Sequence, residues 1–210
     1  MLSAPPAIGN GHGPYPGAVT AGHTLDIAAA EEAVAGLLAA LGVPPGSETA
    51  ERTPRRVAAA LAELLTPPAF EFTVFPNTSG QHDLVIARQV PFTSLCAHHL
   101  LPFSGTAWVG YLPGEQVAGL SKLARVVRWA AAGLRLQEEM GQAVASFLAE
   151  SLDCAGAGVI LAAEHQCVTA RGARAHGSDT VTVALRGALR EDPALRAEFL
   201  TLAAPGGGLR

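Results

Sequence analysis

Two segments of the chain, 120–134 and 138–152, repeat apolar residues at the spacing of an amphipathic helix. The apolar face of the first segment comprises Leu120, Leu123, Val126 and Val127. The apolar face of the second comprises Met140, Val144, Phe147, Leu148 and Leu152. We therefore predict two consecutive helices in the middle of the chain.

Four other segments have the composition of β-strands, and they are 84–95, 105–113, 156–166 and 178–187. Apolar and polar residues alternate in the second of these, which ends at a Pro-Gly turn, while Thr and Val alternate in the fourth. Two strands thus precede the pair of helices and two follow it, which gives the order ββααββ. An order that does not strictly alternate favours an α+β fold, with helices on one face of an antiparallel sheet.

The predicted α+β domain occupies residues 69–203, and shorter regions flank it. Residues 1–23 are rich in Pro, Gly and Ala and lack periodicity, so we expect a disordered arm. Residues 24–68 show two helical patterns separated by a Pro-Pro-Gly break, which predicts an N-terminal helical region. The glycine-rich residues 204–210 are expected to form a flexible tail.

Residue types at three places predict where helices begin. Thr24 and Asp26 are both candidate N-caps for the first helix. Thr53 directly before Pro54 is the pattern of an N-cap followed by the first helical residue, inside the second helical segment 48–65. Asp192 followed by Pro193 predicts the start of a last helix in the same way.

Composition excludes several classes of protein. Of the 210 residues, 49% are hydrophobic and 15% are charged, and the net charge of -4 gives no general attraction to nucleic acid or to an anionic membrane. The N-terminus does not resemble a signal peptide, and no apolar run reaches the roughly 20 residues of a membrane span. Three cysteines without framework spacing favour a reducing compartment. We expect a cytoplasmic protein that binds neither membrane nor nucleic acid.

Cys96, His99 and Cys167 form a divided set of three candidate metal ligands. Structural zinc sites usually have four protein ligands, whereas catalytic sites have three and leave a position for water. Thiolate and imidazole suit zinc better than magnesium or calcium. His98 and His165 lie beside this set and could transfer protons near neutral pH. A metal that activates water, with two proton-transfer groups beside it, indicates a hydrolase. Spacing alone leaves open that both cysteines are small buried residues and that His99 is an interior hydrogen-bonded histidine.

The remaining candidate residues have equally open interpretations. Lys122 and Arg125 lie at the start of the segment 120–134, and Arg171 follows Cys167, so the three could bind a polyphosphate or could be solvated surface charges. Glu138, after Gln137, could stabilise a helix start or accept two N–H donors of a base such as guanine. Cys154 is far from other ligand types, and we interpret it as structural.

Seven motifs in order make the chain similar to the GTP cyclohydrolase I family over about residues 26–202: TPRRVA, CAHHLLPFSG, GLSKLARVV, LQEEM, EHQCVTARG, SDTVT and REDPALRAEFL. The resemblance implies the tunnelling fold, a ββααββ unit, which makes 69–203 the catalytic domain. It also implies a homodecamer of two pentamers, with active sites between subunits. The implied cofactor is zinc on Cys96, His99 and Cys167.

The resemblance further implies a reaction and the residues that perform it. A water activated by zinc adds to C8 of GTP, His98 and His165 transfer the protons that open the imidazole ring and release formate, and the product recloses to 7,8-dihydroneopterin triphosphate. Ser121 is implied to be a third catalytic residue, which assists near the ribose. The implied substrate-binding residues are Glu138 with Gln137 at the guanine edge, Lys122, Arg125 and Arg171 at the triphosphate, and Arg56 from an adjacent subunit.

Two departures from the family pattern leave alternatives. The family usually has Glu where this chain has Ala97, and Arg-Leu-Thr where it has Glu139-Met140-Gly141. We expect a working enzyme nevertheless, since every residue implied to touch metal or substrate is present. The alternative is a catalytically weak homologue, or one of altered specificity in a specialised pterin or deazapurine pathway. A zinc nucleoside deaminase would need H-x-E and P-C-x-x-C, which are absent. The related nitrile reductase would need NADPH and a nucleophilic Cys in place of zinc.

Overall fold

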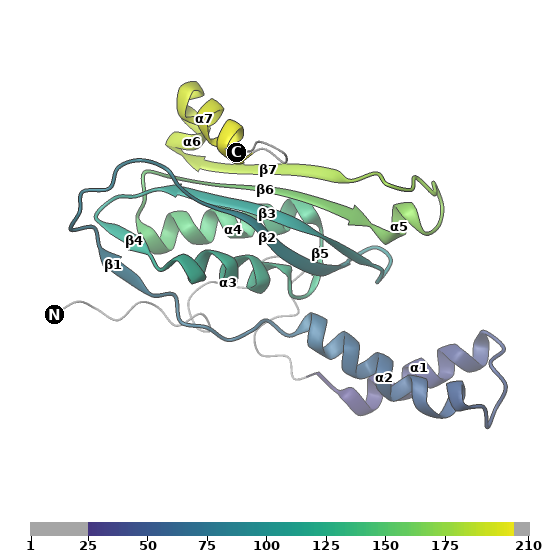
Figure 1. Ribbon diagram of the computed structural model, residues 1–210. Coiled ribbons are helices and arrows are strands. Elements are labelled where there is room, and N and C mark those ends of the chain that lie inside the picture. Colours follow the sequence, from purple (N-terminus) through teal and green to yellow (C-terminus); the bar gives the residue numbers. More distant parts are fainter. Residues whose placement is uncertain (1–24, 204–210) are drawn as a thin grey trace.

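A computed structural model describes residues 25–203 of the chain (Figure 1). The predicted arm 1–23, the candidate N-cap Thr24 and the tail 204–210 lie outside the described residues. Within the described part, no helix is both long and apolar enough to cross a membrane.

A five-stranded sheet forms the body of the molecule, with the strand order β5-β2-β3-β6-β7. Its strands are β2 (Val85–Cys96), β3 (Pro102–Leu112), β5 (Leu134–Arg135), β6 (Gly156–His165) and β7 (Thr180–Gly187). All neighbours pair antiparallel except the short β5, which is parallel to β2. The four long strands are the predicted ones, and the predicted ββααββ order is confirmed. A separate two-stranded sheet pairs β1 (Val74–Pro76) with β4 (Gln116–Ala118).

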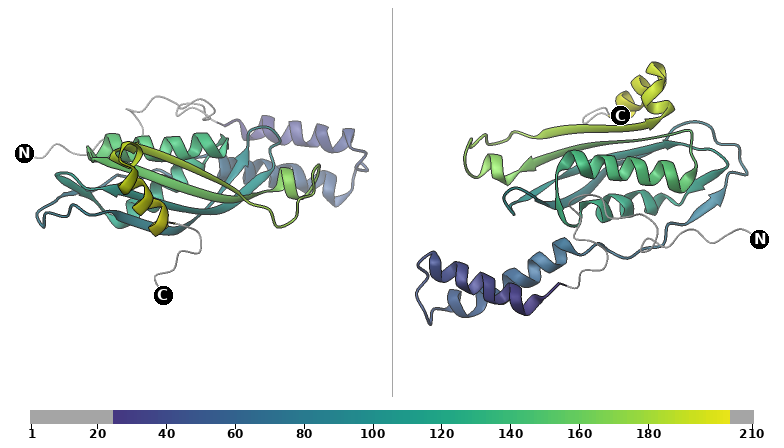
Figure 2. Two further views of the ribbon diagram at one scale, coloured as in Figure 1. Left: turned by 90° about the horizontal axis from the view of Figure 1, so that it is seen from above. Right: turned by 180° about the vertical axis from the view of Figure 1, so that it is seen from behind.

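Helices α3 (Leu120–Ala131) and α4 (Gln137–Leu152) lie side by side on one face of the sheet (Figure 2). Their apolar faces pack on inward-facing strand residues such as Val109 and Leu161, both fully buried. Burial of this shared face stabilises the fold, because apolar area removed from water contributes about 25 cal/mol per Å². The core therefore lies between the sheet and these two helices, as the pattern predicted, except that Leu120 does not belong to it, because its side chain is 74% exposed at the start of α3.

The opposite face of the sheet carries a second, smaller core. Helices α6 (Ala188–Glu191) and α7 (Pro193–Ala203) cover it and bury Phe199 against strand residues that include Trp108 and Ile160. The α+β prediction placed helices on one face only, so this C-terminal cover is an addition to it. Asp192 caps α7 as predicted, since its Oδ1 accepts from the backbone N–H of Ala194 at 2.7 Å.

An antiparallel pair of helices, α1 (Ile27–Ala40) and α2 (Glu48–Leu65), projects from the body (Figure 1). Asp26 caps α1 as predicted, accepting from Ala29 N at 2.9 Å. The prediction of Thr53 as the N-cap of the second helix is wrong, because α2 begins at Glu48 and its N-cap is Ser47. The Ser47 hydroxyl accepts from Ala50 N, and Glu48 favours the positive end of the helix. The helix then runs through Pro54, which is buried.

Candidate active site

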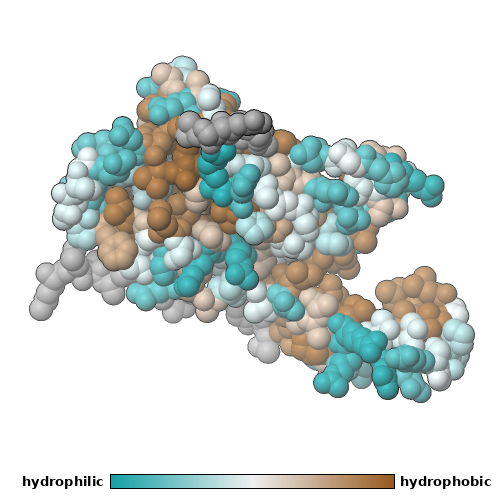
Figure 3. All heavy atoms as spheres, viewed as in Figure 1, coloured by the Kyte–Doolittle hydropathy of each residue, from teal (hydrophilic) through white to brown (hydrophobic). Residues whose placement is uncertain are grey.

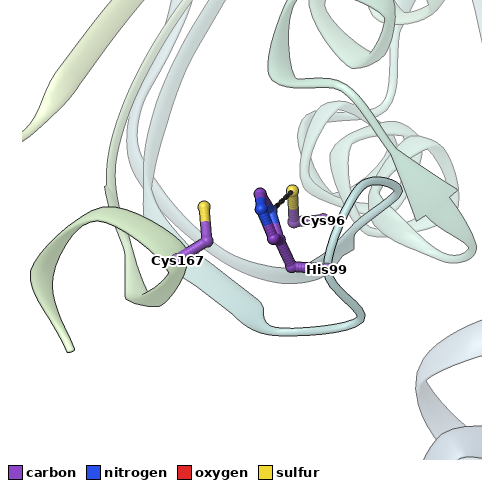
Figure 4. Close-up of side chains that lie close together, drawn as sticks. All are labelled: Cys96, His99 and Cys167. Atoms are coloured by element: carbon purple, nitrogen blue, oxygen red, sulfur yellow. Dashed lines mark hydrogen bonds between the residues drawn. The ribbon is translucent and has the colours of Figure 1, made fainter. Parts of the chain in front are cut away.

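Cys96 and His99 come together because the chain makes a tight turn at the end of β2. Cys96 is the last residue of that strand, and the backbone N–H groups of His99 and Leu100 both donate to the Cys96 carbonyl, at 3.3 and 2.9 Å. Leu100 adopts a left-handed conformation, with φ 56°, to complete the turn. The Nδ1 atom of His99 thereby lies 3.7 Å from the Cys96 Sγ (Figure 4).

Cys167 reaches the same place from the strand on the other side of β3. It lies in the single-turn helix α5 (Gln166–Thr169), which follows β6 directly, and β6 pairs with the strand that begins at Pro102. The ligand atoms of Cys96, His99 and Cys167 all lie within 4.8 Å of one another. Among the described residues, no other group of three ligand-type side chains is gathered so closely. The predicted set is thus brought together, although its members are 68 residues apart in sequence (167 − 99).

The chemistry of these donors fits a metal ion. Burial raises the pKa of the Cys167 thiol, and the neighbouring Cys96 raises it further, while Arg171 acts in the opposite direction. Two thiols at close range resist joint ionisation unless a cation lies between them. In a tetrahedral zinc site, a sulfur bonded at 2.3 Å and a nitrogen bonded at 2.0–2.1 Å lie roughly 3.6 Å apart, close to the 3.7 Å between Cys96 Sγ and His99 Nδ1. The group could therefore hold a metal ion with little rearrangement.

The two spare histidines have different surroundings. His98 is exposed, and its ring lies edge-on to that of His99, with centroids 6.1 Å apart. His165 is half-buried and stacks on Phe103, with centroids 4.6 Å apart and planes 2° apart. Its Nε2 lies 2.8 Å from Gln137 Oε1. Burial lowers the pKa of His165, and the nearby Glu138 carboxylate opposes this shift.

Gln137 and Glu138 begin α4 but face different environments. The Gln137 side chain is only 2% exposed and its amide is hydrogen-bonded inside the protein. Glu138 is exposed and lines a shallow groove of about 220 Å³ between α4 and β7. The other residues that line this groove are Gly141, Gln142, Thr182, Val183 and Ala184.

The predicted phosphate-binding residues lie on three separate elements, and all are exposed except Lys122, which is half-buried. Ser121, Lys122 and Arg125 lie in the first turns of α3, whose first backbone N–H groups lack a side-chain cap. Arg171 follows α5, and Arg56 lies on the projecting α2. The charge of Arg171 lowers the pKa of the Cys167 thiol, against the larger effect of burial. Within residues 25–203, no hydrogen bond or ion pair joins the predicted phosphate-binding residues to the Cys-His-Cys group.

Sequence reasoning missed two residues that shape the site. Phe103 supports the His165 ring, and the register of β3 with β6, which pairs these two residues, is the signal that could have revealed it. Arg135 is 5% exposed, and its backbone carbonyl accepts from Ala97 N at 3.1 Å, beside the metal-ligand turn. Its Nε also bonds the Ala132 carbonyl after α3. A charged residue read from sequence gives no sign of such burial.

The chain matches known proteins over most of its length. The family described as GTP cyclohydrolase I matches residues 30–204. A curated protein of Dehalococcoides mccartyi named GTP cyclohydrolase 1 is 42% identical over 184 residues, covering 85% of this chain and 97% of that protein. Another, from Halalkalibacterium halodurans and of the same name, is 43% identical and covers 82% and 94%. A solved apo structure, the archaeosine synthase QueF-Like, aligns at 17% identity over 50% of this chain and 93% of its own, and its TM-score of 0.41 is too low for any argument.

Proposed function

The chain belongs to the GTP cyclohydrolase I family, and from this membership we propose that it hydrolyses GTP at C8 of the imidazole ring, releases formate and recloses the product to 7,8-dihydroneopterin triphosphate. The observation that carries the proposal is the meeting of Cys96, His99 and Cys167 within 4.8 Å. Three protein ligands suit a catalytic metal because they leave a coordination position for water. This product would place the enzyme at the entry to folate and pterin biosynthesis.

Zinc is the metal that the donor set favours. Two thiolates and an imidazole are soft to borderline ligands, which bind zinc better than they bind magnesium or calcium. A zinc ion held there would lower the pKa of a water molecule and supply the nucleophile for C8. The turn after β2 and the start of α5 hold the three ligand side chains in place.

His98 and His165 are the proposed proton-transfer residues. Ring opening and formate release require protons to reach the leaving nitrogen atoms, and imidazole exchanges protons near neutral pH. His98 directly precedes the ligand His99, and His165 lies two residues before the ligand Cys167. The two side chains therefore belong to the two halves of the candidate metal site. Burial keeps His165 biased toward its neutral form, which can accept a proton.

The proposed contacts hold GTP at its guanine base and at its triphosphate. Glu138 accepts N–H groups of the guanine edge from its place in the groove beside β7. Lys122, at the uncapped start of α3, and Arg125 and Arg171 bind the triphosphate, with Ser121 near the ribose. A local collection of positive charge allows a chain of net charge -4 to bind a polyanion.

We propose that the protein assembles as a homodecamer of two pentamers, with Arg56 reaching the site of an adjacent subunit. Exposed apolar surface supports assembly: none of the residues of α1 is buried, and the side chains of Leu37 and Leu41 are 58% and 71% exposed (Figure 3). The outer strand β7 also exposes Val181 and Val183. Residues 24–68 would thus serve assembly, while 69–203 carry the chemistry, in the cytoplasm.

A product assay tests this function directly. Purified zinc-loaded protein is incubated with GTP, and the products are identified by mass spectrometry. Formate and dihydroneopterin triphosphate are the expected products. A ring-opened formyl compound without formate would show that hydrolysis stops halfway. Absence of turnover, with zinc and GTP both bound, would contradict the proposal and favour a homologue of altered specificity, for which Ala97 and Glu139 are the only indications.

A further inference from the structure

The amide of Gln137 is surrounded by protein acceptors, although the residue lies beside the proposed guanine ligand. Its Nε2 lies 3.1 Å from the Leu161 carbonyl oxygen, 2.9 Å from that of Thr180 and 3.1 Å from Thr182 Oγ1. An amide nitrogen carries two hydrogens, so these partners satisfy it completely. The side chain is 2% exposed and keeps no free donor for a ligand.

These neighbours determine which way the amide points. Backbone carbonyl oxygens can only accept, so the end of Gln137 that faces Leu161 and Thr180 must be the NH₂ group. The oxygen end then faces His165, with Oε1 2.8 Å from Nε2. A carbonyl oxygen has no hydrogen to donate, so the hydrogen in this bond belongs to His165 Nε2.

This bond selects one tautomer of the neutral imidazole. A neutral histidine carries a single N–H, and if Nε2 has it then Nδ1 holds the free lone pair. Among the described residues, Nδ1 of His165 has no hydrogen-bond partner. The stacked Phe103 ring, 4.6 Å away, fixes the plane of the imidazole so that the Gln137 bond fixes its orientation within that plane.

We propose that Gln137 is a positioning residue that holds His165 as the Nε2–H tautomer, which makes Nδ1 the atom that exchanges protons in the reaction. Its effect on catalysis rests on the proposed function. The role differs from the guanine contact expected from the sequence, and it leaves Glu138 as the residue of this pair that binds the base. Gln137 acts through His165 and does not touch the substrate.

The tautomer can be observed without any turnover. The metal-loaded decamer or other native assembly is labelled with ¹⁵N-histidine, and solid-state NMR spectra are recorded near pH 8.5, where a free imidazole is neutral. A His165→Asn variant identifies the His165 signals among those of the seven histidines. The expected spectrum shows a protonated Nε2 and an unprotonated Nδ1. Protonation at Nδ1 would overturn the inference, whatever the protein does to GTP.

Kinetics then separates positioning from substrate binding. Gln137→Leu removes the acceptor, and we expect kcat to fall on the order of 100-fold, with unchanged KM and metal content, because a misplaced acid–base group loses most of its contribution. Gln137→Glu keeps an acceptor for His165 but turns its second oxygen toward the carbonyl oxygens of Leu161 and Thr180, so we expect it to lose stability and not to restore the wild-type rate. A raised KM for GTP with unchanged kcat in Gln137→Leu would instead show a substrate contact and overturn the proposal.

A matched control accounts for lost stability. Tyr111 is also buried, and its hydroxyl accepts from Ala118 N at 2.8 Å, eight residues along β3 from Phe103 (111 − 103). Tyr111→Phe therefore removes a buried hydrogen bond far from the site and should leave kcat unchanged. An equal fall of kcat in this control would count against a specific role of Gln137. A wild-type protein that does not act on GTP would refute the proposed function alone, since the NMR result stands without it.

Discussion

Phe103 and His165 face each other across neighbouring strands as stacked rings, with their planes 2° apart. They are direct partners in the register of β3 with β6. Gly105, two residues further along β3, lies so close to the backbone of Ala162 that a Cβ there would overlap its carbonyl oxygen. The sheet thus holds the imidazole against the benzene ring at the end where the metal-ligand residues gather, and a side chain at 105 would force the strands apart.

We expect Phe103→Leu to lower kcat by more than its loss of stability would explain. Leucine fills part of the space but offers no flat surface, so the His165 ring gains freedom and spends less time in its productive orientation. The unfolding free energy should fall by roughly 1–3 kcal/mol, as for other buried aromatic truncations. Phe72→Leu is the control, because Phe72 is equally buried but stacks edge-on against Phe147, within the core of α4. Equal kcat losses in the two variants would refute a special role for the stack.

Replacing Cys167 by Ser should abolish metal binding while leaving the fold intact. The change removes one thiolate of three ligands, and Cys167 is only half-buried in a single-turn helix, so little packing is lost. Inductively coupled plasma mass spectrometry of the purified protein measures the outcome. Cys154→Ser is the control and should retain the metal, since the Cys154 thiol bonds the Gly156 carbonyl at 3.4 Å instead. Unchanged metal content in Cys167→Ser would contradict the three-ligand site.

His98→Ala and His165→Ala should keep the metal and lose the product. Neither residue belongs to the group of three ligand atoms, so zinc content should match the wild type. The exposed His98 can be removed without loss of stability, whereas His165→Ala loses the stack on Phe103 and the bond to Gln137 and should unfold at a lower temperature. General acid–base catalysis typically contributes 10²–10⁴-fold, and losses of this size are expected in the mass-spectrometric assay. Loss of metal in either variant would show that ligand and proton-transfer roles have been exchanged.

The order of the main elements was predictable because each has a strong local signal. The stripe of Leu123, Val126 and Val127 can form only a buried helix face, and α3 presents it to the sheet. The short elements α5, α6 and β5 carry no such signal, since two to four residues are too few for a period to repeat. The start of α2 was misplaced because Thr53-Pro54 imitates a helix start, whereas Ser47 offers the same hydroxyl chemistry earlier in the chain.

The metal ligands could be predicted from the sequence, whereas the residues that surround His165 could not. The chain has only three cysteines and seven histidines, so few sets of ligands are possible, and the resemblance selects Cys96, His99 and Cys167, which the structure joins. Gln137 and Phe103 are ordinary core or helix residues by type. Only the pairing of β3 with β6 and the entry of α4 bring them against His165, and such long-range contacts have no signature in one sequence.

Stability should fall at alkaline pH partly through Cys154. Burial raises the pKa of this thiol above its ordinary value of 9.0, although a hydrogen bond to Gly156 opposes the shift. A group whose pKa is higher in the folded state stabilises the fold fully below its unfolded pKa, and this contribution is lost as the pH rises through the folded pKa. The unfolding free energy of Cys154→Ala should therefore decline less than that of the wild type above about pH 9. Denaturant titrations of both metal-loaded proteins at pH 8 and 10 make the comparison, and parallel declines would exclude the thiol as a contributor.

Charging the apolar surface of α1 should dissociate the proposed assembly. Leu37 and Leu41 are exposed in the single chain, so Leu37→Glu and Leu41→Glu should not lower the stability of an isolated subunit. In an assembly that buries them, an unpaired carboxylate in an apolar contact is strongly unfavourable. Light scattering after size-exclusion chromatography should then show a smaller species than the wild type. Glu32→Gln, on the same helix but polar in both forms, is the control. If both leucine variants keep the wild-type mass, α1 does not lie in a subunit contact, and its apolar residues require another explanation.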